Sequence, residues 1–147
     1  MILSSESGKF TIMNNPIKGK GNNMKVIGFV RVSTGHQKLS IDNQTAEITD
    51  YCKKTDGLEL VDILQEENVS GGSIERTGFT KMLEMVENKE IDGIVCLNLS
   101  RIGRKASMTL DLINKCLDND VFIYDMKDGT DTRTPGGRMS VKMRSVI

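Results

Sequence analysis

The sequence predicts an α/β fold, in which a mostly parallel central sheet of about four strands has helices on both faces. Two observations lead to this prediction. Short apolar runs alternate along the chain with segments whose apolar residues recur at helical spacing, as is typical of strand–helix–strand units. The first run is apolar almost throughout rather than at every second position, which indicates a strand buried on both faces. Parallel neighbours need right-handed crossovers, so helices cover the sheet.

Three segments divide the chain. Residues 1–23 are rich in Ser, Asn, Gly and Lys and poor in apolar residues, so we expect a disordered leader. Residues 24–133 hold the alternating pattern and form the expected domain. Residues 134–147 begin with Thr-Pro, which is a typical N-cap and first helical turn, so we expect them to start a last helix.

The first half of the domain predicts two strands and two helices. Residues 25–32 and 58–65 are the apolar runs expected as strands. Between them, residues 40–55 carry an apolar stripe at helical spacing, with Ser40 as the expected N-cap. After a polar, glycine-bearing loop, residues 77–88 place apolar side chains at positions i, i+3, i+4 and i+7, which predicts the second helix.

The second half repeats the alternation. Residues 91–99 and 121–126 are expected strands, and residues 104–118 between them are an expected helix with one apolar face. In sheets of this kind, ligands bind beyond the carboxyl ends of the strands. The loops that follow the first three strands are therefore expected to converge on one site.

Composition narrows the function classes. Lys+Arg and Asp+Glu number 20 each, so the net charge is zero. A neutral chain argues weakly against DNA as a partner, or indicates that the main DNA-binding part lies elsewhere. The three cysteines are scattered in apolar segments, as expected of free buried thiols in a reducing cytosol. With one histidine and these cysteines we expect no metal site, and no apolar run is long enough to span a membrane.

Two clusters could carry chemistry. Arg31 and Ser33 end the first strand two residues apart, and side chains at that spacing leave a strand on the same side. Arg101 and Arg104 follow the third strand. A serine can attack a phosphate without a basic partner if cations lower its pKa and stabilise the transition state. Arginine suits that task because its planar fork binds phosphate oxygens in pairs.

Each of these residues also has an ordinary interpretation. Ser33 alone is a common strand end, and Arg101 with Arg104 could be a solvated helix start. Cations at a helix N-terminus oppose the macrodipole, however, and such a local conflict tends to mark function. Arg76 ends a polar loop, where by itself it is a surface residue. His36 is the only histidine, so no histidine-based triad is available.

Four further residues are candidates for supporting the site. Gln37 and Gln44 bracket the start of the first helix, where capping or surface roles are the alternatives. Ser70 opens a Ser-Gly-Gly run that resembles a phosphate-binding nest. Asp92 precedes the strand that leads to the second arginine cluster, where an ion pair with an arginine is the alternative.

Taken together, these motifs resemble the catalytic domain of the serine recombinases, the resolvase/invertase family. The similarity covers residues 24–147, in the family's order and spacing. The matching residues are 29–34, Gln37, Ser40, Ile41, Gln44, 69–71, 76–79, 99–104 and 137–139. The resemblance implies site-specific cleavage and rejoining of double-stranded DNA through a serine joined to the 5′ phosphate. It implies no metal or other cofactor, a homodimer that pairs into a synaptic tetramer, and a cytoplasmic, nucleoid-associated location.

The resemblance also assigns roles by position. It implies that Ser33 is the nucleophile and that Arg31, Arg101 and Arg104 bind the phosphate. It implies that Arg76 is contributed from the polar loop. Gln37, Gln44, Ser70 and Asp92 are the expected supporting residues.

The chain departs from the family pattern in three places. Ser100 stands where many resolvases have aspartate. The acidic position before Ser70 is filled by Glu66 or Glu67, and the sequence leaves the register open. The family continues into a long dimerisation helix and a DNA-binding domain, whereas this chain stops at residue 147. Because a neutral domain lacks the phosphate contacts that supply affinity, we expect this chain alone to recombine DNA inefficiently.

Three interpretations follow. The first is a recombinase catalytic domain. The second is a non-catalytic remnant that only dimerises with intact recombinases. In that case Ser33→Ala would leave this association unchanged. The third is a binder of small phosphates or nucleotides on a similar sheet, which leaves the pairing of Arg31 and Ser33 with the later arginines unexplained.

Overall fold

A computed structural model describes residues 23–32, 38–67, 78–103 and 105–144. Their centre is a five-stranded sheet in the order β2-β1-β3-β4-β5, in which β1 to β4 are parallel and β5 pairs antiparallel with β4. The strands are β1 Met24–Val32, β2 Leu58–Glu67, β3 Gly93–Cys96, β4 Phe122–Asp125 and β5 Thr130–Asp131. The mostly parallel α/β fold predicted from the sequence is confirmed.

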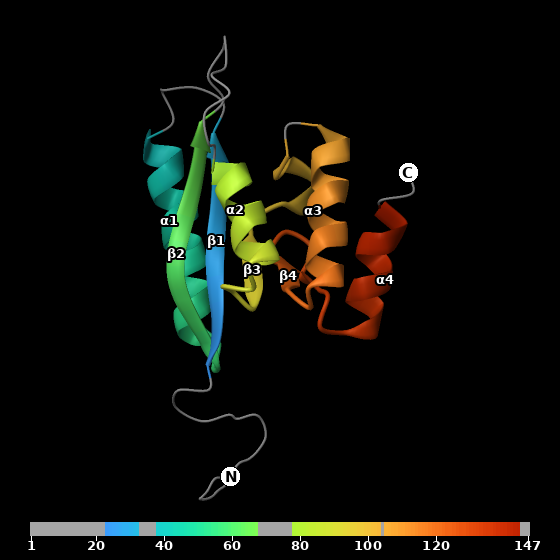
Figure 1. Cartoon of the computed structure of the whole chain (residues 1–147). Coiled ribbons are helices and arrows are strands. Elements are labelled where there is room, and N and C mark those ends of the chain that lie inside the picture. The colour runs from blue at the N-terminus through green and yellow to red at the C-terminus, as the bar shows by residue number, and fades with distance from the viewer. Residues whose placement is uncertain (1–22, 33–37, 68–77, 104, 145–147) are drawn as a thin grey trace, which may run out of the picture.

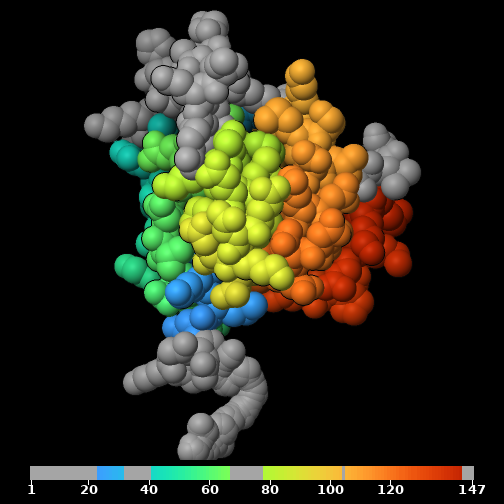
Figure 2. All heavy atoms as spheres, viewed as in Figure 1, coloured from blue at the N-terminus to red at the C-terminus, as the bar shows by residue number. Residues whose placement is uncertain are grey.

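Helices cover both faces of this sheet (Figure 1). The α-helices are α1 Lys38–Lys54, α2 Gly78–Glu87, α3 Ala106–Asp118 and α4 Pro135–Arg144, and one short 3-10 helix, η1, spans Leu99–Arg101. Helix α1 lies on one face, and α2 and α3 lie side by side on the other (Figure 2).

The sheet has a hydrophobic core on each face, and alternate residues of β1 pack into one core or the other. The reason is that successive side chains of a strand point to opposite faces. Ile27 and Phe29 pack with the buried residues of α2 and α3. Val26 and Val30 pack with Ile48 of α1 and its neighbours. The central strand is therefore apolar on both sides, which explains the continuous run in the sequence.

The structure corrects the expected boundaries in several places. The third strand ends at Cys96 rather than at residue 99, because the chain turns into η1 there. Helix α3 begins at Ala106 rather than at residue 104. Ser40 lies inside α1, which begins at Lys38, so its expected role as N-cap is wrong. Strand β5 lies between the expected strand over residues 121–126 and the expected last helix, in a segment where the sequence predicts no strand; it is two residues long, too short for a sequence pattern.

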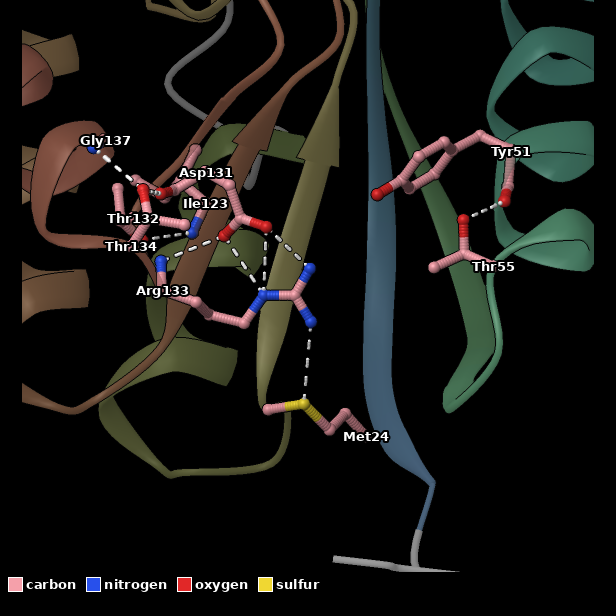
Figure 3. Close-up of polar contacts among 9 residues, drawn as sticks. All are labelled: Met24, Tyr51, Thr55, Ile123, Asp131, Thr132, Arg133, Thr134 and Gly137. Carbon is pink, nitrogen blue, oxygen red and sulfur yellow. Dashed lines mark hydrogen bonds and ion pairs between the residues drawn. The ribbon is translucent and has the colours of Figure 1, made fainter. Parts of the chain in front are cut away.

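The turn between β5 and α4 is held by several hydrogen bonds among its own residues (Figure 3). The Thr134 hydroxyl accepts a hydrogen bond from Gly137 N at 2.9 Å, so it caps the helix as predicted. The same hydroxyl donates to the Asp131 carbonyl oxygen at 2.8 Å. Val141 is fully buried in the core, whereas Met139 and Met143 are 63% and 61% exposed. One side of α4 thus packs on the domain and the other presents methionines to solvent.

The described residues offer neither a membrane-spanning helix nor a metal-binding cluster. No helix there has the length and apolar character needed to cross a membrane. In the same part of the chain, His, Cys, Asp and Glu side chains form no group of three or more that could hold a metal ion.

Candidate active site

The fold brings two of the predicted residues, Arg31 and Arg101, to one edge of the sheet. Arg31 is the penultimate residue of β1, and Arg101 is the last residue of η1, which follows β3 after a two-residue connection. Strands β1 and β3 are hydrogen-bonded parallel neighbours, so their carboxyl ends lie side by side. The predicted convergence of these two segments is observed for Arg31 and Arg101.

Arg31 is bonded directly to the turn formed by residues 98–103, called the 98–103 turn below. Its Nη1 donates to the carbonyl oxygen of Arg101 at 3.0 Å and to that of Gly103 at 3.1 Å. Carbonyl acceptors orient the guanidinium without neutralising it. The group has three further N–H donors, so a fixed, charged fork remains able to bind an anion.

Both ends of the 98–103 turn are held. At its start, Asn98 Oδ1 accepts hydrogen bonds from Ser100 N at 3.1 Å and from Ser100 Oγ at 2.7 Å. At its end, Gly103 N donates to Thr109 Oγ1 at 3.1 Å. Gly103 is buried, and a Cβ there would lie 2.8 Å from Met108 Cβ, so the turn packs directly on the first turns of α3.

A buried carboxylate, that of Glu66, stands on the strand beside β1, and the sequence left open whether Glu66 or Glu67 fills this acidic position. Glu66 is 4% exposed and is the register partner of Arg31 on β2. Its Oε1 accepts a hydrogen bond from Phe79 N at 2.9 Å, which caps the start of α2. The acidic position before Ser70 was ambiguous between Glu66 and Glu67. The signal that could have resolved it is the alternation along β2, which places Leu64 and Glu66 on the same face.

The start of α2 is fitted closely to the strand ends. A Cβ at Gly78 would lie 2.5 Å from the Gln65 carbonyl oxygen, so only glycine permits this approach. The Phe79 ring packs edge-on against Phe29, with ring centroids 6.5 Å apart. The end of β1, the end of β2 and the start of α2 therefore form one packed unit beside Arg31.

The remaining predicted residues divide into three groups. Ser33, Gln37, Ser70, Arg76 and Arg104 lie outside the described residues. Gln44 is half-buried in the second turn of α1, on the opposite face from α2. Asp92 lies at the other edge of the sheet, where its Oδ2 accepts a hydrogen bond from Lys25 N at 2.8 Å. The structure therefore does not bring Asp92 to the edge that carries Arg31 and Arg101.

The cysteines are free and buried, as expected from their apolar surroundings. Burial raises the pKa of the Cys116 thiol to about 12 and raises the pKa of Cys52 as well. Thiols in this state are poor nucleophiles, because the reactive form is the thiolate.

Comparisons with known proteins agree with this architecture. The family described as resolvase, N terminal domain, matches residues 26–147. The chain is 32% identical over 113 residues to a DNA-invertase of Escherichia phage P1, covering 77% of this chain and 54% of the invertase. It is also 32% identical over 103 residues to a resolvase of Clostridium perfringens, covering 70% of this chain and 49% of the resolvase. The chain thus spans about half the length of these curated relatives.

Solved structures show the same fold. The N-terminal catalytic domain of TP901-1 integrase superposes with a TM-score of 0.68 at 26% identity, covering 83% of this chain and 92% of that domain. A resolvase family site-specific recombinase from Streptococcus pneumoniae superposes with a TM-score of 0.69 at 26% identity, covering 84% of this chain and 86% of the other.

Proposed function

This chain belongs to the resolvase N-terminal domain family of serine recombinases, and we propose that it cuts and rejoins DNA strands through a covalent bond between Ser33 and a DNA 5′ phosphate. The observation that carries the proposal is the bonding of Arg31 to the 98–103 turn. It joins the strand end that immediately precedes Ser33 in sequence to the turn that bears Arg101. A phosphate bound between these arginines would lie within reach of the segment that follows Val32.

The proposed cleavage step is a displacement at phosphorus. The Ser33 hydroxyl oxygen attacks and loses its proton, an O–P bond forms, and the bond from phosphorus to the 3′ oxygen breaks. The 3′ oxygen takes up a proton and leaves as a hydroxyl. Attack of a 3′ hydroxyl on the phosphoserine reverses these steps and rejoins the strand.

The arginines have the charge that this step needs. Negative charge grows on the phosphate oxygens in the transition state, and fixed donors aimed at those oxygens lower the barrier. We assign this role to Arg31 and Arg101, together with Arg104 and Arg76. Because guanidinium groups supply the positive charge, cleavage is expected to continue in the presence of a metal chelator.

Supporting roles and assembly complete the proposal. We assign Gln37, Gln44 and Ser70 to hold the substrate strand or the segment that carries Ser33. The substrate is double-stranded DNA, and exchange of strands requires a homodimer that pairs into a tetramer. Such a protein would act where the DNA is, at the nucleoid.

One observation favours a second candidate function, a module that associates with intact recombinases without cutting DNA. Met139 and Met143 of α4 are both more than half exposed, and exposed methionines are typical of interaction surfaces. In this case the association survives Ser33→Ala unchanged and no covalent product forms.

Covalent capture of DNA tests the proposal. The substrate is a pool of randomised duplexes with sulfur in place of the bridging 3′ oxygen, since the released 3′ thiol attacks phosphorus slowly and the adduct accumulates. We expect a denaturant-stable protein–DNA product that mass spectrometry maps to Ser33. Ser33→Ala should abolish it, whereas Ser107→Ala, at an exposed serine of α3, should not. An adduct that forms equally in Ser33→Ala contradicts the proposal.

A further inference from the structure

We propose that Asn98 is a positioning residue for the phosphate-binding arginines. Through its side-chain carbonyl it sets the conformation of the 98–103 turn, which holds Arg31 and carries Arg101. This inference rests on the function proposed above, because it concerns the same site.

Asn98 lies where the chain leaves β3 and enters η1. Its backbone is extended, with φ −154° and ψ 105°, which is the conformation of a helix N-cap. Its Oδ1 accepts two hydrogen bonds from Ser100, and its main-chain oxygen accepts a third from Arg101 N at 3.1 Å. One residue therefore accepts three hydrogen bonds from the turn that follows it.

This cap matters because the turn has little stability of its own. A 3-10 helix of three residues has strained hydrogen bonds and depends on its surroundings. Arg31 nevertheless requires two of the turn's carbonyl oxygens, those of Arg101 and Gly103, to converge on one nitrogen. Asn98 bonds the beginning of the turn and Thr109 bonds its end, so the segment that carries both carbonyls has anchors other than Arg31.

The chemical identity of Asn98 fits this role. Asparagine, aspartate and serine are comparable N-caps, but a carboxylate at this position would place negative charge beside the arginines and repel a phosphate. Asparagine provides the acceptor without the charge. A neutral acceptor should therefore replace Asn98, whereas a side chain without an acceptor should not.

The full chain allows two readouts. The first is the rate of covalent capture of the sulfur-substituted duplexes, measured with duplex affinity by fluorescence anisotropy. The second is nitrogen-15 NMR of the arginine side chains, in which the Arg31 Nη1 protons exchange slowly while both carbonyls hold them. The variants are Asn98→Ala, Asn98→Ser as the neutral acceptor, and Asn114→Ala as the control at an exposed asparagine of α3.

We expect Asn98→Ala to slow capture by about tenfold or more, with little change in duplex affinity, and to lose the Arg31 signal. Asn98→Ser should restore both readouts, and the control should match the wild type. The proposal is overturned if Asn98→Ala keeps the Arg31 signal, or if it loses the signal but captures DNA at the wild-type rate. If the wild-type chain captures no DNA, the proposed function fails, and the NMR comparison alone decides whether Asn98 positions Arg31.

Discussion

The guanidinium of Arg31 is joined to the main chain of Arg101 by a 3.0 Å hydrogen bond that connects residues 70 positions apart in the sequence. The bond uses a backbone oxygen rather than a carboxylate. It brings two arginines to one edge of the sheet and leaves the charge of Arg31 uncompensated in this contact. The proposed binding of a phosphate at this edge depends on these two cations, and the fixed guanidinium of Arg31 is the part that can be tested most directly.

Replacing Arg31 with lysine should therefore remove most of the activity while preserving the charge. A single ammonium cannot bond both carbonyls and also present a flat pair of donors to a phosphate. We expect capture to fall by about a hundredfold or more, with a free energy of unfolding changed by about 1 kcal/mol. Lys105→Ala, at an exposed cation just before α3, is the control and should cost only a few-fold. Near wild-type capture by Arg31→Lys would remove Arg31 from the site.

The buried carboxylate of Glu66 should matter for the stability of α2. Glu66→Ala removes the acceptor for Phe79 N and leaves that amide unsatisfied, so we expect a loss of about 1–3 kcal/mol in the free energy of unfolding. Glu66→Gln keeps an oxygen in the same place and should lose less. Urea denaturation measures both, with Glu59→Ala, at an exposed position on the same strand, as the control. Equal stability of Glu66→Ala and the control would show that the cap contributes nothing.

The turn before α4 should give a pH-dependent stability. Asp131 bonds Arg133 through both carboxylate oxygens, with Arg133 Nη2 2.7 Å from Oδ2 (Figure 3). The guanidinium also lies 4.1 Å from the centroid of the Phe122 ring. Burial raises the pKa of the Asp131 carboxyl, but its hydrogen bonds to Arg133 and the charge of that residue outweigh burial, so the pKa is lowered from its ordinary value.

The sign of that pH dependence follows from the direction of the shift. A carboxyl whose pKa is lowered by folding stabilises the folded state at a pH above its unfolded-state pKa. This stabilisation is lost as the pH falls through the lowered pKa of the folded state. Wild type should therefore exceed Asp131→Asn in melting temperature at pH 7, and the difference should shrink below about pH 4. A difference that stays constant down to pH 2 would contradict the pairing.

Two glycines in α4 should respond oppositely to the same substitution. A Cβ at Gly137 would collide with the Asp131 carbonyl oxygen, whereas the space around Gly136 is open. Gly137→Ala should push α4 away from the turn and destabilise it by about 1–3 kcal/mol. Gly136→Ala should stabilise the helix by about 0.5–1 kcal/mol, because it reduces the entropy of the unfolded chain. Hydrogen exchange of the α4 amides distinguishes the two, and faster exchange in both variants would contradict this packing.

The sequence by itself determined the fold class, the burial of β1 on both faces and the two clusters of candidate residues, Arg31 with Ser33 and Arg101 with Arg104. These are local properties, because the periodicity of a strand or helix depends only on residues close together in the sequence. The position of Arg31 at the end of a strand likewise follows from the residues around it. Parallel strands then require their carboxyl ends to share an edge, so even the meeting of Arg31 and Arg101 could be predicted.

Only the tertiary structure decided what depends on partners distant in sequence. Strand β5 is two residues long and pairs antiparallel with β4, whose hydrogen bonds define it as a strand. Glu66 accepts a hydrogen bond from Phe79 N at the start of α2, and Asp92 accepts one from Lys25 N at the opposite edge of the sheet. Hydrogen bonds between segments far apart in the chain carry no local periodicity, which is why the sequence could not reveal them.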